Sequence, residues 1–158
     1  AAAMVRNGVS PDALEKHLKQ HPLDPNRRPF GGLSLLLLAV ASGHHPDLAV
    51  SLVRVLRRAG AHVDPSTYAP QHCTLKNDRR MLAELLEGHS SPEQAVGVME
   101  ECRLLELAVT ENCGCSHADV ISYTLQKGAR PDDRVGRYLE DDPHKCISQC
   151  VHQLFAAV

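Results

Sequence analysis

The chain has 158 residues, of which 43% are hydrophobic, 3% are aromatic and 23% are charged, and its formal net charge is −2. This size suits one domain or three to four units of a repeat array, and an aliphatic core with so few aromatic residues favours an all-α repeat protein over a β-sandwich. The slight negative charge gives no general attraction to nucleic acid, and no apolar stretch has the length that a bilayer requires, so neither nucleic-acid binding nor membrane insertion is expected.

The N-terminal stretch, residues 1–31, predicts one helix followed by an extended tail. A Ser-Pro-Asp sequence at 10–12 is a typical helix start, because serine can accept from a free N–H group and proline is tolerated in a first turn. A turn follows at 23–26. We interpret this stretch as a partial repeat that caps the array and places Arg27 and Arg28 on an exposed hairpin; a merely solvated turn is the alternative for these two residues.

The central stretch, residues 32–64, predicts two helices joined by a tight turn. Leucine, alanine and valine crowd residues 35–40, which is typical of a helix packed between others. Ser34 can cap this helix, Gly43 can end it, and Pro46 can start a second helix whose apolar residues recur at helical spacing. Such a unit cannot bury its apolar face alone, so it predicts stacked neighbours.

The next stretch, residues 65–100, has the weakest pattern. Residues 65–71 read as a loop, followed by a helix that ends at Gly88 and a second helix that starts at Ser91. The pair could be a divergent repeat or an insertion.

A second copy of the central unit is predicted over residues 101–132. Its apolar run at 104–109 parallels residues 35–40, and a Gly-Ala pair ends its second helix as one does in the central unit. Internal self-similarity is the sequence signature of a repeat array. In this alignment Leu38 and Leu107 are equivalent, and both are expected to be buried.

The C-terminal stretch, residues 133–158, predicts a charged linker and then a final helix from about Pro143. We interpret that helix as part of a last, incomplete repeat, so the chain could be a piece of a longer protein.

A fixed pattern of small, apolar and polar residues runs through the central unit: Gly32, Ser34, Leu36, Leu38, Ala39, Gly43 and His44, then Leu52, Leu56, Gly60, Ala61, Val63 and Asp64. This pattern resembles the ankyrin repeat, whose halves read roughly G-x-T-P-L-H-L-A-A-x-x-G-H and V-x-x-L-L-x-x-G-A-D-V-N. Leu35 replaces the proline of that motif and Leu37 replaces its first histidine. The resemblance implies a single all-α domain, an ankyrin-type solenoid of about three to four degenerate repeats with units 1–31, 32–64, 65–100, 101–132 and 133–158.

Ankyrin-repeat proteins are generally binding modules that act through hairpin tips and the concave face of their first helices. The resemblance therefore implies a non-catalytic scaffold that binds a partner protein and needs no cofactor, with self-association or fusion within a larger protein left open. The residues at the tips and on the first helices are Arg27, Arg28, Phe30, Leu33, Ala41, Ser42, Met99, Glu100, Cys102, Thr110 and Glu111.

The cysteines and histidines offer an alternative function, a metal-binding or redox-sensing domain. The candidate zinc ligands are Cys113, Cys115, His117, Cys146 and Cys150, since thiolate and imidazole groups at short spacing can bind zinc. Their spacings, C-x-C-x-H and H-x-C-x₃-C-x-H, match no standard zinc module, and a disulfide is equally compatible with them.

An enzyme is not expected, because the chain has no nucleophile elbow, Walker loop, H-E-x-x-H or G-x-G-x-x-G motif. Cys102 lies within a helical pattern, where a buried free thiol is common. Since the chain is also not a short, cysteine-dense secreted sequence, a reducing intracellular compartment, the cytoplasm, is favoured.

Overall fold

The computed structural model describes residues 1–28, 31–87, 91–110 and 117–140. These residues form helices and no strand, which confirms the all-α class. The helices are α1 (Ala2–Arg6), α2 (Pro11–Gln20), α3 (Leu35–Ala41), α4 (Pro46–Arg58), α5 (Ala69–Leu75), α6 (Arg79–Leu86), α7 (Pro92–Glu101), α8 (Leu104–Thr110), α9 (Ala118–Gln126) and α10 (Asp133–Glu140), with a 3₁₀ turn η1 (Pro65–Thr67) before α5. None of the described helices has the length and apolar character needed to cross a membrane.

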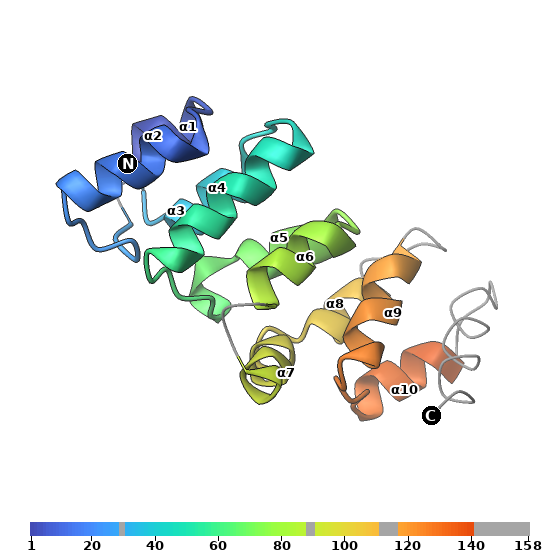
Figure 1. The fold of residues 1–158 in the computed structure, drawn as a ribbon. Helices are drawn as coiled ribbons and strands as arrows, with labels where there is room; N and C mark the ends of the chain where they lie inside the picture. Colours follow the sequence, from blue (N-terminus) through green and yellow to red (C-terminus); the bar gives the residue numbers. More distant parts are fainter. Residues whose placement is uncertain (29–30, 88–90, 111–116, 141–158) are drawn as a thin grey trace.

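The helices stack in two rows, which can be followed from blue to orange in Figure 1. The first row runs α1, α3, α5, α8, α10, and each of these helices packs against the next; the second row runs α2, α4, α6, α9 in the same way. The helix pairs α3–α4, α5–α6 and α8–α9 also pack across the rows. Helix α7 belongs to neither row and packs against α8. The helices of each row therefore bury their apolar surface against their neighbours in the stack.

Recurring positions mark the units of the stack. The first-row helices α3, α5 and α8 carry small, fully buried residues at one equivalent position, namely Ala39, Cys73 and Ala108. Residues with positive φ follow the helices α1, α3 and α5: Gly8 (65°), Gly43 (69°) and Asn77 (51°). A small side chain lets neighbouring helices approach closely, and a left-handed residue ends α1, α3 and α5 in the same manner.

The N-terminal ends of α2, α3 and α4 lie where the sequence predicts them. The hydroxyl of Ser10 accepts from the N–H of Ala13 at the start of α2, and that of Ser34 accepts from Leu37 at 3.0 Å at the start of α3. Pro46 is the first residue of α4. These three boundaries depend on short-range chemistry, so they could be read from the sequence.

Hydrogen bonds from side chains to the backbone join consecutive units. Nε2 of His44 donates to the carbonyl of Val5 at 2.8 Å. The amide of Asn26 donates to the carbonyl of Gly60 at 3.2 Å and accepts from the N–H of His62 at 2.7 Å. Because both side chains satisfy backbone groups of a neighbouring unit, they fix how the units stack.

Three predicted segments were wrong. The loop predicted at 65–71 contains η1 and the start of α5, because Pro70 lies in the first turn of a helix, where proline is tolerated. The helix predicted up to Gly88 is instead two helices, α5 and α6, separated by the left-handed Asn77, and this pair is a full unit of the stack. The linker predicted from 133 forms α10, while the helix predicted from Pro143 lies outside the described residues.

The N-terminal unit and the register of the first row also needed correction. Residues 1–31 contain two helices rather than one: α1 packs against α3 in the first row, and α2 packs against α4 in the second. Leu38 and Leu107 do occupy equivalent positions, but both are only half-buried. The buried leucines are Leu36 and Leu105, two residues earlier, because they share the face of Ala39 and Ala108 that meets the neighbouring helices.

Candidate functional site

The loop before α3 and the loop before α5 lie side by side. The guanidinium of Arg28 donates to the hydroxyl of Ser66, and the buried hydroxyl of Ser34 donates to the carbonyl of Thr67 at 3.1 Å. These two contacts bring together residues that are far apart in the sequence. The N-terminal ends of two first-row helices, α3 and α5, are thereby held next to each other.

The η1 turn places Tyr68 in an unusual backbone conformation. Oδ1 of Asp64 accepts from the N–H groups of Ser66 at 2.8 Å and Thr67 at 3.2 Å, and the hydroxyl of Thr67 donates back to the carbonyl of Asp64 at 2.8 Å. Tyr68 follows with φ of 56° and makes no side-chain cap for α5. A bulky residue in the left-handed region is strained, and such strain persists only where the surrounding structure imposes it.

Large apolar side chains are exposed along the first row. Tyr68 is 61% exposed, Leu75 at the end of α5 is 45% exposed, and Leu33 before α3 is 42% exposed. Ala41 is also exposed, at the position in α3 that corresponds to Leu75 in α5. We call Arg28, Leu33, Ala41, Tyr68 and Leu75 the first-row face. This surface combines apolar side chains, one aromatic ring and one arginine.

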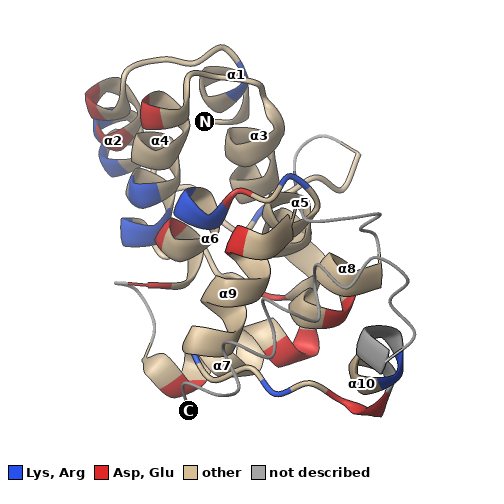
Figure 2. Ribbon diagram, turned by 90° about the vertical axis from the view of Figure 1, so that its right-hand side faces the viewer, with Lys and Arg blue, Asp and Glu red and all other residues tan. Residues whose placement is uncertain are grey.

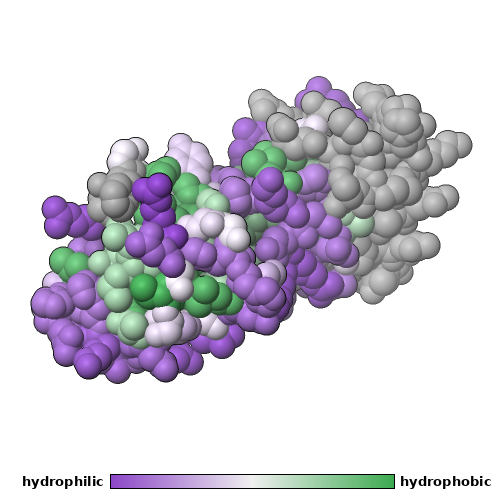
Figure 3. All heavy atoms as spheres, turned by 90° about the horizontal axis from the view of Figure 1, so that it is seen from above, coloured by the Kyte–Doolittle hydropathy of each residue, from purple (hydrophilic) through white to green (hydrophobic). Residues whose placement is uncertain are grey.

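Charge is unevenly distributed along the stack. Residues 1–80 contain eleven Lys and Arg against six Asp and Glu, whereas residues 81–140 contain five against eleven. Figure 2 shows the basic residues mainly on α2, α4 and α6 and acidic ones on α7, α8 and α10. In Figure 3, apolar side chains gather over the N-terminal helices and hydrophilic side chains surround them. The half of the chain that carries the first-row face is therefore positively charged.

The two described cysteines are free thiols in the core and are poor nucleophiles. Burial raises the pKa of Cys73 far above its ordinary value and raises the pKa of Cys102 to about 12. Because the thiolate is the reactive form, both side chains are unreactive while the chain is folded. Their surroundings suit packing rather than catalysis.

The predicted interaction residues fall into three groups. Those on the surface are Arg27, Arg28, Leu33, Ala41 and Glu100, and those partly buried are Ser42 and Thr110. Met99, 1% exposed, and Cys102 are buried, so neither lies on the surface as a partner-binding residue would, although a buried thiol at Cys102 agrees with its position in a helical pattern. The predicted hairpin tip is in fact α7 and its C-cap, and Met99 belongs to the side of α7 that joins the core. Phe30 and Glu111 lie outside the described residues.

The predicted zinc ligands are mostly outside the described residues, as Cys113, Cys115, Cys146 and Cys150 all are. The fifth candidate, His117, lies with Nε2 3.0 Å from the carbonyl of Leu75. Within the described part of the chain, no three His, Cys, Asp or Glu residues come together in a way that could hold a metal ion.

Sequence reasoning did not single out Tyr68 and Leu75, because it assigned residues 65–71 to a loop and left residues 65–100 open as either a divergent repeat or an insertion. A faint signal exists: the small residue Cys73 stands in α5 where Ala39 stands in α3, and Asn77 follows as Gly43 does. Aligning these positions would have placed Leu75 beside Ala41. The strained conformation of Tyr68 has no sequence signal, since tyrosine rarely adopts it.

No model of a protein family, no curated protein and no solved structure matches this chain. Its function is therefore inferred from its own residues and their arrangement.

Proposed function

We propose that this chain is a degenerate repeat array of the ankyrin type that binds another protein, without catalysis, through the first-row face. The repeat assignment is supported by the two rows of packed helices, by the recurring small buried residues, and by the left-handed residues that end α1, α3 and α5. Helix α7 and the η1 turn depart from a regular repeat, which is why we describe the array as degenerate.

The observation that carries this proposal is the exposed, strained Tyr68, whose turn is joined to the loop before α3 by the hydrogen bonds of Arg28 and Ser34. Exposed large apolar side chains often mark interaction sites, and tyrosine and arginine are residue types that often dominate binding energy. Glycine would suit the backbone at Tyr68 better, by about 1 kcal/mol, because it adopts positive φ without a steric penalty. A tyrosine at this position costs backbone stability but places its ring in solvent, where a partner protein could contact it.

The variant Tyr68→Gly tests this proposal, because a display role and a packing role predict opposite results. We expect it to raise the stability of the fold slightly and to weaken partner binding at least tenfold, which corresponds to about 1.4 kcal/mol. Immobilised wild-type and variant chains would be compared for the proteins they retain, and the retained protein would then be titrated in purified form.

The matched control is Lys16→Ala, an exposed change on α2 in the second row. It should leave both the thermal midpoint and the retained protein unchanged. If Tyr68→Gly and Leu33→Asp both retain the same protein with unchanged affinity, the first-row face is not the binding surface. If Tyr68→Gly destabilises the chain, the tyrosine serves packing instead.

A further inference from the structure

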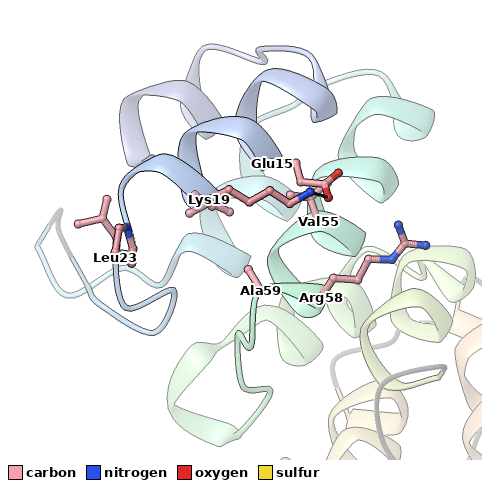
Figure 4. A pocket seen from close by; sticks show the side chains of 8 residues that line it. Glu15, Lys19, Leu23, Val55, Arg58 and Ala59 are labelled. Atoms are coloured by element: carbon pink, nitrogen blue, oxygen red, sulfur yellow. Dashed lines mark ion pairs between the residues drawn. The ribbon is translucent and has the colours of Figure 1, made fainter.

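A second surface lies on the opposite row, in a groove of about 330 Å³ between α2 and α4. Figure 4 shows side chains from both helices around it, with Lys19 reaching towards Glu15 and Arg58 at its edge. Apolar side chains contribute to its lining, among them the buried Val55, the partly buried Leu18 and the 40% exposed Leu23. The groove therefore joins apolar walls to a charged rim.

Three cations lie at the groove or on α4, namely Lys19, Arg54 and Arg58, and they differ in whether a carboxylate already pairs with them. Nζ of Lys19 lies 2.7 Å from Glu15, and Arg54 forms two hydrogen bonds with Glu84, at 3.0 and 2.9 Å. Arg58, in contrast, makes no hydrogen bond or ion pair with the described residues, and its side chain is exposed. Its charge acts on Glu15 at longer range, where it adds to the effect of Lys19 in lowering the pKa of that carboxyl group. A guanidinium in this state can bind a carboxylate through two parallel hydrogen bonds.

We propose that this groove docks an acidic segment of another protein, with a bulky apolar side chain in the groove and an adjacent carboxylate on Arg58. The positive charge of residues 1–80 favours the approach of such a segment. The groove is near the lower end of the size range of ligand pockets, so it suits one or two anchoring side chains rather than a large helix. This surface belongs to the second row, and the proposal does not depend on the first-row face.

A second copy of the chain fits this groove poorly. The acidic helix α7 exposes Glu93, Glu100 and Glu101, so its charge would suit Arg58. However, the large apolar side chains exposed on the described part of the chain are Leu23, Leu33, Tyr68 and Leu75, all within the positive half. The acidic half thus offers no large apolar anchor among its described residues, which favours a different protein as the occupant.

The test uses the full chain and a fluorescein-labelled peptide in which two glutamates stand on each side of a Leu-Phe pair. Fluorescence anisotropy would measure its affinity, alongside two control peptides with Lys for Glu or Ala for Leu-Phe. We expect the first peptide to bind, with a salt-sensitive affinity, and both controls to bind at least tenfold more weakly. Absence of measurable binding by the Glu-Leu-Phe peptide would overturn the proposal.

Variants of the chain locate the binding. Arg58→Glu reverses the unpaired charge, and Ala59→Leu fills the groove from an exposed position; each should weaken binding at least tenfold. Arg80→Glu is the matched control, because it makes the same charge change at an arginine that already pairs with Asp47 at 2.6 Å and does not line the groove. A loss with Arg80→Glu as large as with Arg58→Glu would show diffuse charge attraction and overturn the docking site.

Two further outcomes are decisive. If Arg58 only balances the negative end of α4, Arg58→Gln lowers the thermal midpoint and leaves peptide affinity unchanged, which overturns its docking role. If sedimentation shows that the chain self-associates and that Arg58→Glu abolishes this, the occupant is a second copy and our assignment is wrong. Tyr68→Gly should leave peptide binding unchanged, so failure at this groove and failure of the first-row face are distinguishable.

Discussion

Replacing Leu36 with alanine tests which side of α3 faces the stack. Leu36 is 1% exposed, whereas Leu38 on the same helix is half-buried. A buried leucine truncated to alanine costs roughly 2.7–5.0 kcal/mol through lost transfer energy and the cavity left behind, so we expect about 3 kcal/mol for Leu36→Ala. Leu38 already exposes part of its side chain and would leave an open site, so we expect about 1 kcal/mol for Leu38→Ala.

Urea denaturation followed by circular dichroism would measure both variants against the wild type. For a chain of this length, 1 kcal/mol corresponds to roughly 2–4 °C in Tm, so thermal melts should separate the two variants by several degrees. The pair shares one helix and one substitution, so differences in helix propensity cancel. Equal losses of stability in the two variants would show that the buried face of α3 has been assigned incorrectly.

The other predictions concern the backbone, a buried thiol and an ion pair. Gly43→Ala should cost about 1 kcal/mol in a denaturation experiment, because φ is 69° and nothing lies within 4 Å of the added Cβ. The unfolded thiol of Cys102 ionises at pH of about 8.5, whereas its folded pKa is about 12; stability should therefore fall as pH rises between these values, and Cys102→Ala should reduce that fall. A double-mutant cycle on Arg54 and Glu84 should give a coupling of roughly 0.5–1 kcal/mol that decreases with added salt, because Arg54 is half exposed.

The predictable part of this fold consists of boundaries that depend on a few neighbouring residues. Ser34 bonds to an N–H group three residues away, and Pro46 needs only a first turn in which its missing N–H does no harm. The long helix α4 also has a clear apolar periodicity, which its burial pattern reproduces. Such features require no knowledge of what packs against them.

The unpredicted helices are short ones whose stability comes from their neighbours. Helices α1 and α5 have five and seven residues, far fewer than an isolated helix needs, and neither has a side-chain cap. They persist because α1 packs on α3, and α5 packs on α3 and α8. Pro70 contributed to the prediction of a loop, because proline usually interrupts a helix, whereas here it lies in the first turn of α5. The residues of the proposed interaction surface were missed for the same reason, since Tyr68 and Leu75 stand at the two ends of that helix.

In the first-row helices, one position is constrained by packing between helices, and the position two residues later is much less so. At the buried position the three units carry small residues, Ala39, Cys73 and Ala108, because any larger side chain would force the helices apart. Two residues later the side chains are more accessible, with Ala41 and Leu75 exposed and Thr110 partly buried, and the residue type differs between the units. Substitution of an exposed residue such as Ala41 or Leu75 disturbs little buried packing, so its free-energy cost is expected to be small. Under the proposed function, the binding properties of the array can therefore change while its stacking stays the same, and a partner has to be sought from the exposed residues rather than from the repeat itself.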